Sequence, residues 1–240
     1  MKRIRILGIC LVAAFALSAV ASTVASAEPV FVTKAVVGQL ASSSIPISGT
    51  VGAAFLESKA GTKITCTGGK FTGEVTGSKT AVNNVTKFTG CESGGQPCEN
   101  AAAKEIITKK LAAELQGISS TVPGERLTDE TEGRGGKLAE FTCAGVLKVI
   151  VRGSLIGSLS GAAGSTAEAA QTGKLATSKL TFAEAAGIQK YTHFSEGTTG
   201  DKESEQLESS INGGAFEKSG QSVIATIATV PSTWGMGVTK

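Results

Sequence analysis

Histidine and aromatic side chains are scarce in this chain of 240 residues, which contains one His, one Trp, one Tyr and nine Phe. Because His193 is the only imidazole, a histidine-rich metal centre is excluded and acid–base chemistry has a single candidate base of this kind. Sugar-binding clefts commonly use flat rings for stacking, so the few rings give little support to carbohydrate chemistry.

Excess charge of one sign is also lacking. The whole chain has 23 basic and 20 acidic residues, for a formal net charge of +3. Three of the basic residues are Lys2, Arg3 and Arg5, so the remainder is balanced at 20 and 20. Nucleic acids and anionic membranes attract proteins with surplus positive charge. We therefore expect no nucleic-acid partner, and no membrane partner once the leader has been removed.

No apolar run is long enough to span a membrane, since the longest covers only residues 6–17. This run follows the basic residues and precedes Ala25-Ser26-Ala27, a pattern typical of secretory signal peptides. It predicts that residues 1–27 are a signal peptide cleaved after Ala27. Residues 28–240 would then be a single β-rich domain that is secreted.

Cysteine is sparse, with Cys10 in the leader and four more in the mature chain: Cys66, Cys91, Cys98 and Cys143. An even number in an oxidising compartment predicts disulfides. The Gly- and Pro-containing segment from Cys91 to Cys98 resembles a turn that brings its ends together, which favours that pair and leaves Cys66 for Cys143. No C-x-x-C pair is present, so we expect no zinc site.

Alternation of apolar and polar residues dominates the rest of the chain and is typical of half-buried strands. The clearest segments are residues 31–37, 63–67, 70–76, 82–89, 137–144, 146–159, 174–182, 188–194 and 222–229. Turn-forming residues at Gly68-Gly69, Gly135-Gly136 and Asn212-Gly213-Gly214 punctuate them. The pattern predicts an all-β fold, mainly antiparallel, as a sandwich or a barrel.

Two segments depart from this pattern. Residues 101–117 place Ile107, Leu111 and Leu115 on one helical face after Asn100, which favours a single helix with Asn100 as its N-cap. Two strands, at 106–108 and 111–118, are the alternative. Residues 157–173 are small and nearly featureless, which predicts a long loop or an internal domain boundary.

The cysteines lie in short strand-like segments: Ile64-Thr65-Cys66-Thr67, Phe88-Thr89-Gly90-Cys91 with Cys98, and Phe141-Thr142-Cys143, followed by residues 151–157. These segments, which span most of residues 50–160, resemble a group of functionally unassigned secreted proteins of high-GC Gram-positive bacteria. The resemblance implies a disulfide-linked, exported β protein with strands rather than a helix at 104–118, and it supplies no site residue.

Catalytic and metal-binding patterns are weak. His193 and Ser195 would share one face of a strand, but no G-x-S-x-G elbow accompanies them. Asp201, Glu203 and Glu205 repeat the start of a calcium loop, although Gln206 and Asn212 replace the Gly and Glu that the motif requires. We expect no cofactor.

The sequence thus favours an exported, non-enzymatic structural or interaction protein that binds an unknown extracellular partner. One alternative is an extracellular hydrolase that uses Ser195 and His193. The other is a calcium- or carbohydrate-binding module.

Overall fold

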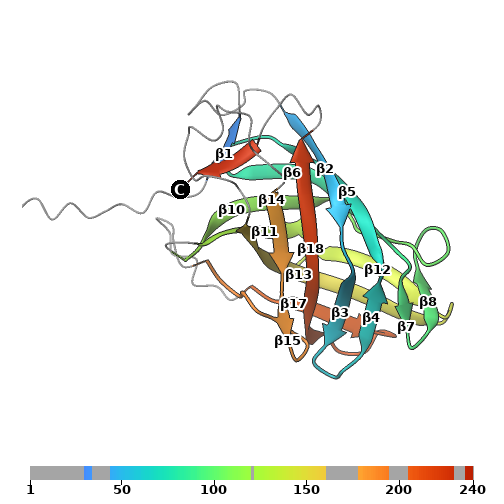
Figure 1. Ribbon diagram of the computed structural model, residues 1–240. Coiled ribbons are helices and arrows are strands. Elements are labelled where there is room, and N and C mark those ends of the chain that lie inside the picture. The colour runs from blue at the N-terminus through green and yellow to red at the C-terminus, as the bar shows by residue number, and fades with distance from the viewer. Residues whose placement is uncertain are drawn as a thin grey trace, which may run out of the picture.

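The computed structural model describes residues 30–33, 44–119, 122–160, 178–194, 205–229 and 236–239, and their regular elements are all β-strands (Figure 1). The strands are β1 (Val30–Thr33), β2 (Ile45–Val51), β3 (Ala54–Ser58), β4 (Lys63–Cys66), β5 (Gly68–Val75), β6 (Thr80–Thr89), β7 (Glu92–Ser93), β8 (Gln96–Glu99), β9 (Ile106–Ile107), β10 (Leu111–Ser119), β11 (Val122–Asp129), β12 (Lys137–Cys143), β13 (Leu147–Ser160), β14 (Ser178–Phe182), β15 (Glu184–Ala185), β16 (Ile188–Gln189), β17 (Leu207–Ile211), β18 (Glu217–Thr229) and β19 (Met236–Thr239). The signal peptide predicted at residues 1–27 lies outside the described residues.

The main sheet has 15 strands, all paired antiparallel, and it closes on itself twice. One closed ring runs through β2, β5, β6, β10, β11, β13, β14 and β18, and then returns to β2. The other runs through β3, β4, β7, β8, β12, β13, β17 and β18. In Figure 1, β18 and β2 cross in front of β10, β11 and β13 on the opposite wall. The all-β prediction is confirmed, and the closed form of the sheet makes it a barrel.

The long strands β13 and β18 belong to both rings and hold them in one stack. The first half of β13 pairs with β12 and β17, and its second half pairs with β11 and β14. Likewise, β18 pairs first with β17 and β3 and then with β14 and β2. The inward side chains of both rings therefore build one continuous apolar core.

The helix expected at residues 101–117 is wrong, and the alternative of two strands is correct. In β10, the buried residues Leu111, Ala113 and Leu115 alternate with half-buried ones, which is the period of a strand. The apolar residues Ile107, Leu111 and Leu115 are also spaced as on one face of a helix, which is why the pattern favoured one. The segment is nevertheless a strand, because β6 and β11 flank β10 and supply its hydrogen bonds. Asn100 does not cap a helix, since its amide bonds both the N–H and the C=O of Ile107.

The three predicted glycine turns have different outcomes. Asn212 and Gly213 have φ of 51° and 72°, and the N–H of Gly214 donates to the C=O of Ile211, so this turn is confirmed. Gly136 lies in the excursion between β11 and β12, as expected for a turn. Gly68-Gly69 is instead the start of β5. A Cβ at Gly69 would lie 2.3 Å from the C=O of Lys87, so the glycine permits close strand approach.

The disulfides join Cys66 to Cys91 and Cys98 to Cys143. Bonding of all four cysteines is therefore correct, but the expected partners are wrong. The β7–β8 hairpin does bring the backbones of Cys91 and Cys98 together, with a 2.9 Å hydrogen bond from Cys98 N–H to Cys91 C=O. Their side chains bond to other strands, because β8 sets Cys98 opposite Cys143 on β12 and β4 runs beside β7.

The loop or boundary predicted at 157–173 begins inside β13, which extends to Ser160. Residues 161–173 lie outside the described residues. The strands on either side of that stretch pair with each other, with Ser158 opposite Thr181, so both belong to one sheet.

Gly153 is the point at which β13 changes partners, and we predict that it tolerates no side chain. Its φ is +99°, and a Cβ would lie 2.0 Å from the C=O of Gln206. Gly153→Ala should lower the free energy of unfolding by about 2 kcal/mol in urea denaturation. The control is Gly61→Ala, where φ is +89° but no atom lies within 4 Å. An equal loss in both variants would contradict the predicted role of the backbone contact.

Candidate functional site

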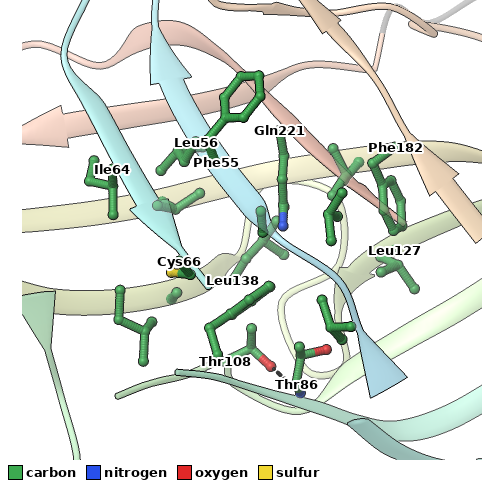
Figure 2. Close-up of a pocket in the computed structure, with 18 of the residues that line it drawn as sticks. Phe55, Leu56, Ile64, Cys66, Thr86, Thr108, Leu127, Leu138, Phe182 and Gln221 are labelled. Atoms are coloured by element: carbon green, nitrogen blue, oxygen red, sulfur yellow. Dashed lines mark hydrogen bonds between the residues drawn. The ribbon is translucent and has the colours of Figure 1, made fainter. Parts of the chain in front are cut away.

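The barrel encloses an apolar cavity of about 110 Å³ between its two rings (Figure 2). Aliphatic and aromatic side chains from opposite walls line it. They include Phe55, Leu56, Ile64, Phe88, Leu127, Leu138, Phe141, Val151, Phe182 and Val223. These residues come from strands far apart in the sequence and meet only because the sheet closes. Eight-stranded barrels have room for packed side chains or for one small ligand.

A few polar groups interrupt this lining. Thr108 Oγ1 accepts a hydrogen bond of 2.9 Å from the backbone N–H of Thr86. Figure 2 shows the Gln221 side chain extending from β18 in among the apolar groups. Its amide has no hydrogen-bond partner within the part of the chain that the structure describes. Within the described residues, the cavity therefore has apolar walls and one amide that is not hydrogen-bonded, a composition typical of sites that hold small molecules.

A second cavity of about 50 Å³ lies next to the first inside the barrel. Both are lined by a shared layer of side chains: Thr86, Leu111, Leu127, Phe182 and Ala225. Beyond that layer, the second cavity is lined by Ile47, Phe71, Asn84, Glu125, Leu180 and Ile227. The two spaces thus lie one behind the other, and only the second contains an ionisable group among its described lining residues.

That ionisable group is Glu125 on β11, which points into the barrel although its chain neighbour Arg126 points out. The residue is 7% exposed, and its carboxyl has no hydrogen bond or ion pair with any described residue. Burial raises the pKa of Glu125 from 4.5 to about 7, because an apolar environment disfavours the charged form. The interior therefore holds an acid that changes charge near neutral pH.

Glu205, the last of the three calcium candidates, is used differently. Its side chain is 3% exposed and pairs with Arg126 at 2.5 Å and with Arg134 at 3.3 Å, and it also accepts a hydrogen bond from Ser154. Its backbone N–H donates to the C=O of Thr192 and its C=O accepts a hydrogen bond from the Gln189 side chain, so Glu205 fastens residues 189–192 to the barrel wall. A carboxylate shared by two guanidinium groups is not available to a cation.

The other predicted site residues do not assemble into a site among the described residues. Asp201, Glu203 and Ser195 lie outside them. His193 is exposed, and its Nδ1 lies 3.3 Å from Thr192 Oγ1, with no carboxylate bonded to it in the described portion of the chain. Within the same portion, no group of three His, Cys, Asp or Glu side chains could hold a metal ion.

Sequence reasoning missed both Glu125 and Gln221. The sequence did not predict the strand at residues 122–129. Had that strand been predicted, one signal would have been present, because adjacent side chains in a strand face opposite sides and one of the charged residues Glu125 and Arg126 must then face inward. The pattern could not say which, since the inward parity depends on where β11 pairs. Gln221 carried no signal, because a single amide in a strand of small residues is common on a solvated face.

The two disulfides indicate that the protein folds in an oxidising environment. Across the described ranges, no helix has the length and apolar character needed to cross a membrane. Comparisons with protein-family models, with curated proteins and with solved structures gave no match.

Proposed function

We propose that this is an exported, non-enzymatic binding protein that holds a small apolar ligand inside its barrel. The observation that carries the proposal is the cavity of about 110 Å³ with its apolar walls and the amide of Gln221, which has no hydrogen-bond partner among the described residues. The signal-peptide pattern at residues 1–27 and the two disulfides support export into an oxidising compartment.

The energetics favour a ligand in this space. Unfilled core volume costs about 24 cal/mol per Å³ in lost packing, so a cavity of this size costs about 2.6 kcal/mol. A ligand that fills it recovers those contacts and removes its own apolar surface from water. An apolar cavity of about 150 Å³ is known to stay dry and to bind benzene, which sets the ligand at roughly a six-membered ring or a short alkyl chain.

Benzene and toluene are suitable probes for this proposal. We expect titration calorimetry on the disulfide-bonded protein to give a Kd below about 1 mM, equivalent to about 4 kcal/mol of binding. The melting temperature should rise with probe concentration, because the ligand binds only the folded state.

Filling the cavity provides the matched test. Ala225 lines both cavities and Ala112 on β10 lies at an outward, half-buried position, so Ala225→Leu should abolish probe binding while Ala112→Leu leaves it unchanged. Val223→Leu, a smaller addition to the same wall, should weaken binding without abolishing it. Absence of binding by the unmodified protein, or equal binding by Ala225→Leu, would contradict the proposal.

A further inference from the structure

The buried acid next to the cavity indicates what kind of ligand the barrel takes. We propose that Glu125 is the polar anchor of the interior site, and that the ligand is a small apolar molecule carrying one basic nitrogen. This inference rests on the proposed function and narrows its ligand class.

The groups that surround Glu125 carry no charge that could pair with its carboxyl. Its backbone pairs with Leu115 on one side and Gly157 on the other, neither of which offers a charge. In the described lining of the two cavities there is no Lys, Arg or His, and Glu125 is the single ionisable side chain. The other polar residues of the smaller cavity are Asn84, whose amide donates to the C=O of Leu111 at 3.0 Å, and Thr86. Among the described residues, neither forms a hydrogen bond with the carboxyl of Glu125, which therefore faces the smaller cavity unpaired.

An unpaired polar group in an apolar interior is unfavourable, and a ligand that pairs with it removes that cost. A protonated amine does this best, since it supplies both the opposite charge and N–H donors for a charge-assisted hydrogen bond. A neutral alcohol offers one weaker hydrogen bond. A carboxylate ligand would place two like charges together with no basic residue in the lining to offset them.

The two adjacent cavities suit such a molecule. The apolar part fits the larger space among Leu138, Val151 and Val223, and the nitrogen fits the smaller one beside Glu125. The shared layer of side chains, which includes Leu127 and Phe182, separates the two spaces, so a ligand that reaches both must displace part of this layer. A straight alkylamine of about six carbons therefore matches both the size and the polarity of the interior.

Proton balance gives the proposal a quantitative signature. Below neutral pH, the protonated carboxyl and the ammonium ion combine to form a carboxylate–ammonium pair and release one proton to solvent. Because the pKa of Glu125 is about 7, binding releases a proton below pH 7 and releases none well above it. Affinity should rise roughly tenfold per pH unit up to that point and level off above it, until the amine itself loses its charge near pH 10.

The experiment compares hexylamine, hexan-1-ol and hexanoate by titration calorimetry at pH 6 and pH 8, using the whole disulfide-bonded protein. We expect hexylamine to bind at least tenfold more tightly than hexan-1-ol at pH 8, and hexanoate not to bind. At pH 6, titrations in buffers of different ionisation enthalpy should show close to one proton released per hexylamine bound. Proton release is measured on the unmodified protein and needs no variant.

Glu125→Gln should lower hexylamine affinity at least tenfold and remove its pH dependence while leaving hexan-1-ol affinity within about twofold. The control Glu132→Gln removes an exposed carboxylate and should behave like the unmodified protein. If hexan-1-ol and benzene bind but hexylamine has no advantage, or if Glu125→Gln leaves that advantage intact, the amine assignment is overturned and the binding function stands. In that case, water rather than an amine forms the hydrogen bonds of the Glu125 carboxyl. If none of the probes binds, the proposed function itself fails.

Discussion

Replacing Cys98 and Cys143 together by alanine should lower the free energy of unfolding by about 4 kcal/mol. The disulfide closes a loop with a sequence separation of 45, and by loop entropy a cross-link of that span stabilises the folded state by this amount. The Cys66–Cys91 bridge spans 25 residues and should contribute about 3.5 kcal/mol. Both losses are measurable by urea denaturation, with mass spectrometry to confirm the remaining bond.

The partner assignment has its own control. Removing a true pair, Cys66 with Cys91, should leave one intact disulfide and no free thiol. Removing Cys91 with Cys98 instead breaks both bridges and should leave two free thiols, because Cys66 and Cys143 then lose their partners. If the second variant showed a disulfide between Cys66 and Cys143 and native stability, the pairing described here would be refuted.

Raising the pH from 5 to 8 should destabilise the protein through Glu125, with a limiting effect of about 3 kcal/mol. Its pKa is about 7 when folded and 4.5 in the reference state, so between these values the folded protein binds the extra proton. The stabilisation that Glu125 contributes is therefore fully present below pH 4.5 and is lost as the pH rises through 7. Its total size is the pKa difference multiplied by 1.36 kcal/mol per pKa unit. Urea denaturation at a series of pH values measures this directly.

Glu125→Gln isolates the contribution of this residue, because other titrating groups cancel in the difference between the two proteins. The variant should be more stable than the unmodified protein at pH 8 and nearly equal to it at pH 4. Glu140 does not interfere: hydrogen bonds from Lys137 and then Lys148 lower its pKa to about 2, so its stabilisation is lost only as pH falls below 4.5 toward 2. Parallel pH profiles for the two proteins would show that Glu125 is not buried in an apolar setting.

The two rings of the barrel differ in how they are stabilised. The disulfides lie near the shorter strands β4, β7, β8 and β12, where few ladder hydrogen bonds hold the second ring together. Glu125 lies in the better-paired first ring, between β10 and β13. The ring with the more extensive pairing is thus the one that tolerates an unfavourable buried acid, as sites that bind ligands commonly require.

The strands themselves were largely predictable from the sequence. β4, β5, β6, β12, β13 and the end of β18 coincide with segments of alternating polarity, because side chains in a sheet alternate between a buried and an exposed face. The alternation was less clear in β2, β3, β11 and β17, which the sequence did not single out. Residues 188–194 show the opposite error, since only Ile188 and Gln189 pair.

The amino-acid sequence by itself determined that this is a β protein with bonded cysteines, because period-two polarity and cysteine chemistry are local properties. Only the tertiary structure decided which strands are neighbours, and with it the cysteine partners, the cavity and the inward direction of Glu125. Residues 47–51 pair with residues 225–229 to close the first ring, for example. Such registers depend on contacts between distant segments, and a shift of one residue would exchange the inside of a strand for its outside.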